Sequence, residues 1–172
     1  EKGILFKKTQ IESQMIDKFI NKLPFELTKA QDKVIDEILC DMTKPHPMQR
    51  LVQGDVGSGK TVIAMVASYF AYLNGFQCAL MAPTEILAKQ HHISFSETFK
   101  NTGANVMLLT GSTTAKNKKN INEAIKNGEC DILIGTHALI EDKVQFENIG
   151  LVITDEQHRF GVRQRSKLLL KN

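Results

Sequence analysis

Eight consecutive residues from Gly54 to Thr61 match the pattern G-x-x-x-x-G-K-[ST], whose residue types suit the binding of a nucleoside triphosphate. The glycines let the backbone approach phosphate oxygens and direct several N–H groups at one point. Lys60 supplies a cation for the β- and γ-phosphates, and the Thr61 hydroxyl can bind Mg²⁺. A glycine-rich turn without a ligand is the alternative, but the fixed positions seldom coincide by chance. The pattern therefore predicts a nucleotide-binding loop of Gly54, Asp55, Val56, Gly57, Ser58, Gly59, Lys60 and Thr61.

Two adjacent acidic residues, Asp155 and Glu156, follow the apolar run 151–154. Beside a phosphate-binding loop, hydrolysis needs a carboxylate for Mg²⁺ and a base that orients the attacking water. We assign Asp155 to the metal, together with Thr61, and Glu156 to the water. An acidic pair at a strand end is more often a solvated loop start, and the loop at Gly54 is what favours catalysis. Lys60, Asp155 and Glu156 are thus the predicted catalytic residues.

The fold must bring these distant groups together. A short strand at 48–53 precedes the loop, and a buried helix that ends near Gly75 follows it. Continuous apolar runs indicate strands covered on both faces, at 78–82, 106–109, 132–134 and 151–154. Helices are predicted between them at 86–99 and 115–126. This alternation predicts an α/β fold with a mainly parallel sheet, helices on both faces, and ligands at the carboxyl ends of the strands.

The first part of the chain contains two further helical patterns. One has apolar residues spaced for a single face, namely Ile11, Met15, Phe19 and Ile20. We interpret 1–22 as a connecting helix and 23–172 as the nucleotide-binding domain. The second helix is predicted to be capped by Thr28 and to have an apolar side formed by Ala30, Val34, Ile35, Ile38 and Leu39. Phe25 and Gln31 stand near its start, close enough to face one small ligand.

Length and composition limit the number of domains and the class of protein. The chain has 172 residues, 42% apolar and 24% charged, which suits one α/β domain. The net charge of +3 is too small to indicate a polyanionic partner by itself. We expect no membrane span, because no run of about 18 apolar residues occurs, and no secretory signal, because the first residues show no charged segment followed by an apolar one. Three widely spaced cysteines predict reduced thiols and a cytoplasmic location, and the missing initiator Met suggests a fragment or processed chain.

Together these motifs resemble the superfamily 2 helicases and translocases, from about Leu23 to Arg165. The resemblance implies a RecA-like P-loop domain that uses ATP and Mg²⁺, with Phe25 and Gln31 at the adenine. It also implies that Gln157 and His158 link the nucleotide site to the nucleic-acid face. Two segments are expected to contact a nucleic-acid backbone through N–H groups and hydroxyls, and they contribute Pro83, Thr84, Gly135, Thr136 and His137. For each threonine alone, capping a helix is an equally good explanation.

Within that superfamily, the sequences 51–61, 81–85, 135–138 and 155–162 are similar to the bacterial branch that remodels stalled forks and Holliday junctions. Gln157 and Ser58 favour that branch over the transcription-repair coupling translocases, which share 159–162. Thr154 departs from the pattern, because an aliphatic residue is usual before the Asp. The resemblance implies a bacterial motor on branched double-stranded DNA in recombination and repair.

A motor of this kind has a second RecA-like lobe, which supplies an arginine to the γ-phosphate, and a wedge domain that splits the fork. Neither is visible in this sequence, so we expect the isolated lobe to bind Mg-ATP weakly and to be nearly inactive. Two alternatives stay open. An RNA helicase of the same superfamily is one, because nothing in a single lobe reads the 2′-hydroxyl. A non-hydrolysing ATP switch is the other, although Glu156 argues against it.

Overall fold

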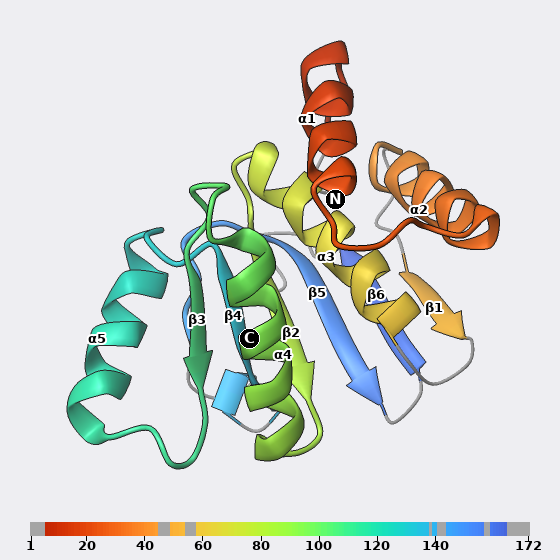
Figure 1. Ribbon diagram of the computed structural model, residues 1–172. Helices are drawn as coiled ribbons and strands as arrows, with labels where there is room; N and C mark the ends of the chain where they lie inside the picture. Colours follow the sequence, from red (N-terminus) through yellow and green to blue (C-terminus); the bar gives the residue numbers. More distant parts are fainter. Residues whose placement is uncertain are drawn as a thin grey trace.

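The computed structural model describes residues 6–44, 49–53, 58–137, 139–140, 144–156 and 159–164, with backbone alone at 49–53, 58–59, 156 and 159–164. The described strands form one sheet in the order β1-β6-β5-β2-β4-β3 (Figure 1). Their bounds are β1 Gln49–Gln53, β2 Gln77–Ala82, β3 Val106–Leu109, β4 Ile132–Thr136, β5 Ile149–Glu156 and β6 Arg159–Gln164. The strands β3, β4, β2 and β5 pair in parallel, which confirms the predicted sheet.

The strand β6 was not predicted from the sequence. It lies between β5 and β1 and pairs antiparallel with both of them. Two antiparallel pairings in succession leave β1 parallel to β5. The segment was missed because its glycine and two arginines interrupt the continuous apolar pattern by which the other strands were recognised. Its Phe160 and Val162 do alternate with other residues, which is the weaker signal of a strand.

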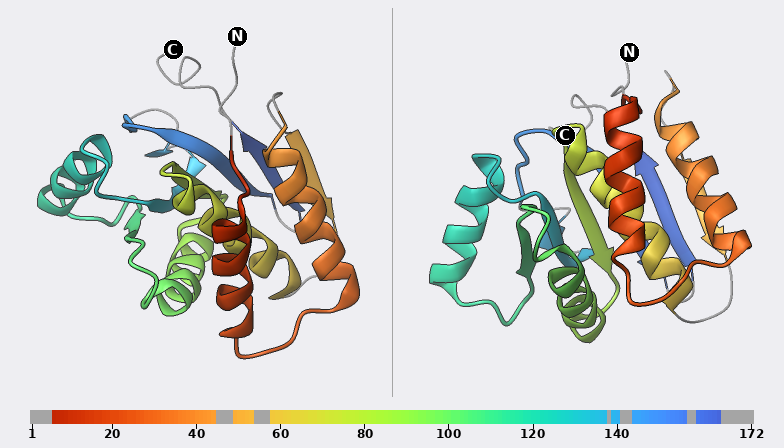
Figure 2. Two further views of the ribbon diagram at one scale, coloured as in Figure 1. Left: turned by 90° about the horizontal axis from the view of Figure 1, so that it is seen from above. Right: turned by 45° about the horizontal axis from the view of Figure 1, so that its top comes forward.

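Helices cover both faces of the sheet, as predicted (Figures 1 and 2). They are α1 Gln10–Asn21, α2 Lys29–Met42, α3 Ser58–Leu73, α4 Glu85–Phe99 and α5 Ala115–Lys126. Side chains of alternate strand residues enter two separate cores. Cys78 and Leu80 of β2 pack with α1 to α4, whereas Ala79 and Met81 pack on the opposite face with Ala124 of α5. The period-two alternation of a strand therefore builds both layers.

The first helix packs on α3 with only part of its predicted apolar face. Ile16 and Phe19 are buried, and the Phe19 ring stacks on Tyr69 with 4.5 Å between centroids. Ile11 is 71% exposed and Met15 is 38% exposed, so only part of the predicted apolar face packs on the domain. The reason is rotation about the helix axis: periodicity identifies apolar positions, but tertiary contact with α3 selects which of them face inwards.

The second helix begins where the sequence predicts. The Thr28 hydroxyl accepts from the Gln31 N–H at 3.1 Å, and the Thr28 N–H donates to Gln31 Oε1 at 2.9 Å. This reciprocal pair is a capping box. The buried residues of this helix are Ile35, Ile38, Leu39 and Met42. Ala30, which was predicted on the same side, is exposed. None of the described helices is long and apolar enough to cross a bilayer.

Candidate functional site at the carboxyl edge of the sheet

The strand register brings the two predicted catalytic segments to one edge. Gln53, the last residue of β1, pairs with Arg159 of β6, and Arg159 pairs on its other side with Glu156, the last residue of β5. The chain enters the phosphate-binding loop directly after Gln53. Because neighbouring strands lie about 4.8 Å apart, Gln53 and Glu156 are about 10 Å apart, two strand spacings. This spacing suits a nucleotide that contacts both segments.

Lys60 lies in the first turn of α3 and is 7% exposed. Its Nζ is buried and has no hydrogen-bond partner among the described residues. A buried ammonium without a partner is costly, because it loses the hydration of bulk water and gains nothing in return. An anionic group beside Nζ would remove this cost. The predicted phosphate ligand therefore fits the only side chain of the described part of the molecule whose buried polar atom lacks a partner.

Asp155 lies one residue before the end of β5 and is 5% exposed. Its Oδ2 lies 2.8 Å from Nε2 of His91 on α4, and the histidine is 9% exposed. An ionised carboxylate can only accept hydrogen bonds, so the ring N–H donates. The sequence did not single out His91. A signal was available, because His91 is the polar member of a buried helical face whose other members are Ala88, Phe95 and Phe99.

Several predicted residues lie outside this description. The loop residues Gly54, Asp55, Val56 and Gly57, and also Gln157 and His158, are outside the described residues. Ser58 and Gly59 begin α3, and Glu156 ends β5, with the backbone alone described. Thr61 is half-buried in the first turn of α3, next to Lys60. The roles assigned to these residues stay predictions.

The two predicted nucleic-acid segments meet at the same edge. Ala82 at the end of β2 pairs with Thr136 at the end of β4, so Pro83 and Thr84 follow one strand where Thr136 and His137 end its neighbour. Met81 pairs on its other side with Thr154 of β5. The edge therefore runs from the acidic pair directly into these segments. Pro83 and Thr84 are exposed, and Thr136 and His137 are half-buried.

Local roles are already visible for two of these residues. The Thr84 hydroxyl accepts from the Leu87 N–H at 3.2 Å and caps α4, which is the alternative that the sequence left open. Gly135 is buried, and a Cβ there would lie 2.4 Å from the Leu109 carbonyl oxygen. Close packing of β4 on β3 thus gives a structural reason for the glycine. Contact with nucleic acid stays a prediction for both positions.

A contact that the sequence did not indicate fixes the start of α4. Glu85 accepts hydrogen bonds from the Ser112 N–H at 3.0 Å and from the Ser112 hydroxyl. The Ser112 side chain, followed by that of Thr110 and the Ser112 backbone, lowers the pKa of Glu85 from its ordinary 4.5 to about 2. Lys89 lies 4.0 Å from the same carboxylate. The loop after β3 is thereby tied to the loop after β2.

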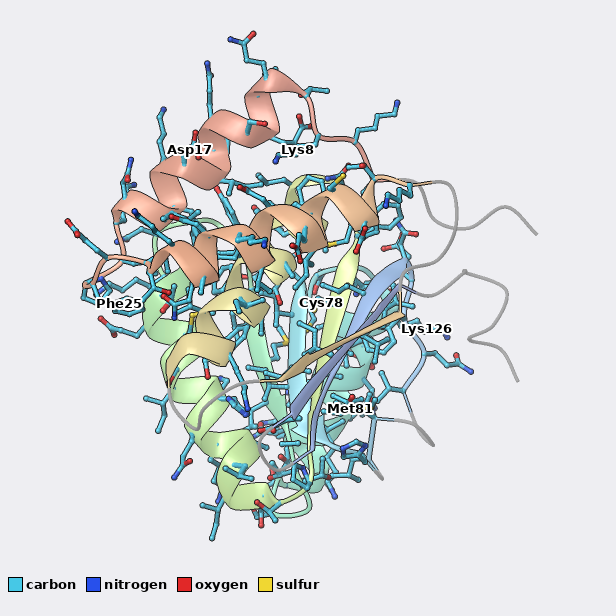
Figure 3. All side chains as sticks on the ribbon, turned by 90° about the vertical axis from the view of Figure 1, so that its right-hand side faces the viewer. Lys8, Asp17, Phe25, Cys78, Met81 and Lys126 are labelled. Atoms are coloured by element: carbon cyan, nitrogen blue, oxygen red, sulfur yellow. The ribbon has the colours of Figure 1, made fainter. Side chains whose placement is uncertain are left out.

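The two residues predicted at the adenine lie near the start of α2. Phe25 is 41% exposed, so its ring is available to a ligand. Gln31 uses Oε1 in the capping box with Thr28. Figure 3 shows Phe25 at the end of the helical layer, on the opposite side of the sheet from Lys126. The local backbone thus gives Gln31 a structural role, and adenine contact stays a prediction for this pair.

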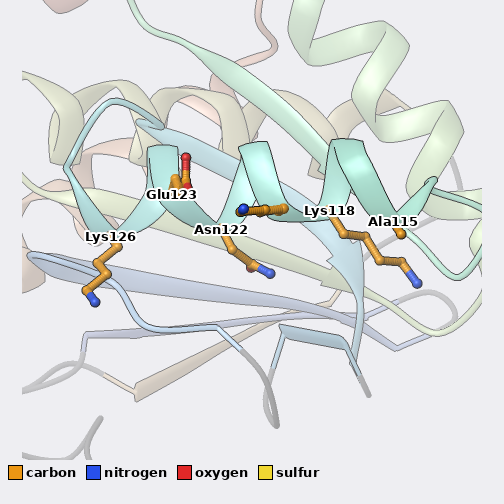
Figure 4. Close-up of a pocket in the computed structure, with 6 residues that line it drawn as sticks. Ala115, Lys118, Asn122, Glu123 and Lys126 are labelled. Atoms are coloured by element: carbon orange, nitrogen blue, oxygen red, sulfur yellow. The ribbon is translucent and has the colours of Figure 1, made fainter.

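A shallow depression of about 460 Å³ lies along the outer face of α5. Its lining is lysine-rich: Ala115, Lys118, Lys119, Asn122, Glu123 and Lys126. Lys118, Asn122 and Lys126 project from the same side of the helix (Figure 4). All six residues belong to one helix, so the depression is the groove between its own side chains. A solvated helix face remains the interpretation of this charge run.

A buried lysine that has no partner among the described residues and a buried acidic strand end lie at one edge of a largely parallel sheet, and together they define a RecA-like P-loop domain. The sequence model of the DEAD/DEAH box helicase family matches residues 28–171, and the chain belongs to that family.

Among individual proteins, the chain is similar to bacterial DNA helicases. The chain is 54% identical over 164 residues to the ATP-dependent DNA helicase RecG of Aquifex aeolicus, which covers 95% of this chain and 21% of the relative. It is 53% identical over 161 residues to RecG of Bacillus subtilis, covering 94% of this chain and 24% of the relative. The chain therefore spans about a quarter of these curated relatives or less.

Solved helicase structures also match the fold of this chain. The structure of RecG bound to a three-way DNA junction matches with a TM-score of 0.83 and 48% identity, over 91% of this chain and 21% of that chain. The UvsW helicase from bacteriophage T4 matches with a TM-score of 0.61 and 17% identity, over 90% of this chain and 53% of that chain. At that identity the second match shows the fold alone.

Proposed function

We propose that this chain is the first motor lobe of an ATP-driven bacterial helicase that unwinds and remodels branched DNA in the cytoplasm. The observation that carries the proposal is Lys60, whose buried Nζ has no hydrogen-bond partner among the described residues while a buried carboxylate stands at the same sheet edge. The chain is similar to RecG, and a RecG structure is solved with a three-way DNA junction bound. This similarity supports branched DNA as the substrate.

The residues of this chain divide the chemistry of ATP hydrolysis. Lys60 neutralises charge on the phosphates, and Asp155 and Thr61 hold Mg²⁺. Glu156 orients the attacking water and accepts its proton. Bound Mg²⁺ supplies positive charge to the phosphate oxygens. Pro83, Thr84, Thr136 and His137, at the neighbouring strand ends, grip the DNA backbone without reading its sequence.

The lobe by itself is expected to be nearly inactive. Its relatives are about four times as long, which leaves room for a second RecA-like lobe and a wedge domain. An arginine supplied to the γ-phosphate by a partner surface is worth about 10³ to 10⁵ in rate. The division of the chain at residue 22 into a connecting helix and this lobe is part of the same proposal.

The test is ATP turnover with Mg²⁺, measured for this chain and for the protein at the length of its relatives, each with forked DNA, RNA duplex or neither. We expect turnover only in the long protein, stimulated by forked DNA and abolished by Lys60→Ala, which removes the cation that faces the phosphates. Stimulation by RNA duplex alone would favour an RNA helicase. ATP binding without turnover under any condition would favour a switch. Turnover by this chain that Lys60→Ala removes would show that the lobe completes its own site.

A further inference from the structure

The hydrogen bond between His91 and Asp155 is a polar link between α4 and β5, whose apolar side chains share one core. The helix α4 follows β2 and packs over β2, β3 and β4. Asp155 belongs to β5, which lies on the other side of β2. His91 Nε2 reaches Asp155 Oδ2 at 2.8 Å, and the two side chains are 11% and 7% exposed. The residues are 64 apart in the sequence, so only the tertiary structure creates this contact.

A buried histidine on a core helix is usually just a satisfied polar group. Two features distinguish His91. Its partner is the carboxylate at the end of β5 where the proposed function places Mg²⁺, and hydrogen bonding fixes one of the two oxygens of that carboxylate. A carboxylate held in this way presents its second oxygen in a restricted direction, which is how partners of metal ligands tune metal affinity elsewhere. A low-dielectric surrounding strengthens the bond further.

The start of α4 is fixed as well. Thr84 caps it, and Glu85 in its first turn is bound to Ser112 in the loop after β3. Lys89 extends the same polar group with a 4.0 Å approach to Glu85. About two helical turns separate the cap from His91. The helix is thus a continuous element whose start lies at the proposed DNA edge and whose side chain holds the proposed metal carboxylate.

We propose that His91 is a positioning residue for Mg²⁺-nucleotide binding: it donates a hydrogen bond that orients Asp155 and thereby connects the start of α4 to the nucleotide site. The proposal rests on the proposed function. It assigns no contact between His91 and the substrate or the metal. It predicts that removing the donor weakens metal binding, and that restoring a donor at the position of Nε2 repairs it.

The experiment uses the protein at the length of its relatives and compares four variants. His91→Leu removes the donor at similar volume. His91→Gln keeps an amide N–H near the position of Nε2, and His91→Asn has an N–H that is too short to reach it. His92→Leu, the adjacent half-buried histidine on the same helix, is the matched control. Circular dichroism and binding to forked DNA establish that each variant is folded.

Two readouts are required. Direct binding of Mn²⁺ with a non-hydrolysable ATP analogue, followed by electron paramagnetic resonance, reports the metal site without turnover. The Mg²⁺ concentration for half-maximal DNA-stimulated ATPase reports it in the working enzyme. We expect His91→Leu and His91→Asn to weaken both about tenfold or more, in the range known for partners of metal ligands. We expect His91→Gln to stay within about threefold of the wild type, and His92→Leu to match it.

The inference would be overturned if all four variants bound the metal as tightly as the wild type. It would also be overturned if His91→Gln and His91→Asn lost metal affinity to the same extent. The last comparison decides the matter even if His91→Leu does not fold. Failure of the proposed function has a different signature, because then the wild type itself would show no DNA-stimulated turnover.

Discussion

Two buried polar side chains, one at the amino ends and one at the carboxyl ends of the parallel strands, differ in their hydrogen-bond partners. Gln77, at the start of β2, is 4% exposed, and its Nε2 donates to the carbonyls of Ile125 at 2.9 Å and Cys130 at 2.8 Å. Its Oε1 accepts from the Asn148 N–H at 2.9 Å. Lys60, at the carboxyl edge, is equally buried and has no partner in the described part of the chain.

The difference separates structure from function. Gln77 connects the end of α5, the start of β4 and the start of β5, and every bond it needs comes from within the chain. Lys60 carries a charge whose compensation the described chain does not provide. Buried polar groups are nearly always paired in native proteins, so an unpaired one in a nucleotide-binding motif indicates a ligand. Gln77 therefore stabilises the fold at the amino ends of the strands, whereas Lys60 lowers the stability of the ligand-free protein at their carboxyl ends.

The largest effect on stability is expected at Gln77. Gln77→Leu leaves the Asn148 N–H and two carbonyls without their partner, and we expect a loss of about 3 kcal/mol in the free energy of unfolding. Urea denaturation of this chain measures it. Nucleotide binding by the remaining folded protein should be unchanged, since Gln77 lies at the opposite edge. A loss of nucleotide affinity in folded protein would break the division between the two edges.

A smaller effect of opposite sign is expected at Lys60. Lys60→Met replaces the ammonium, which has no partner among the described residues, by an apolar side chain of similar length, and we expect the free energy of unfolding to rise by about 1 kcal/mol. The same denaturation series measures this change, and nucleotide binding should be lost. Substantial destabilisation by Lys60→Met would mean that the ammonium is compensated within the chain. Lys60 would then be structural, as Gln77 is.

The smallest effect concerns Glu85, which belongs to the carboxyl edge yet has hydrogen-bond partners within the chain. Because folding lowers its pKa from 4.5 to about 2, the ionised carboxylate stabilises the fold. That contribution is complete above pH 4.5 and disappears as the pH falls towards 2. We therefore expect Glu85→Gln to lower the urea midpoint at pH 7, with a difference that shrinks between pH 4.5 and 2. A difference independent of pH would contradict this account.

Much of the fold follows from local sequence. The predicted bounds of β3 and α5 agree with the structure, and those of β2, β4, β5 and α4 agree within a few residues. Apolar runs and capping threonines are local signals, because backbone hydrogen bonds and the burial of one face act over a few residues. The errors lie where local signals compete. Ala30 was predicted on the apolar side of α2 but is exposed, and β6 contains a glycine and charges.

The candidate site divides in the same way. The sequence alone predicted the motif residues Lys60, Thr61, Asp155 and Glu156, because the chemistry proposed for them depends on residue type and spacing within one turn or strand end. The tertiary structure decided that Lys60 has no partner among the described residues, that His91 holds Asp155, and that Glu85 joins Ser112. The surroundings of Lys60 and the two hydrogen bonds depend on strand register and helix packing. Such long-range pairings leave no periodic pattern in the sequence, since each is fixed only when the whole sheet is assembled.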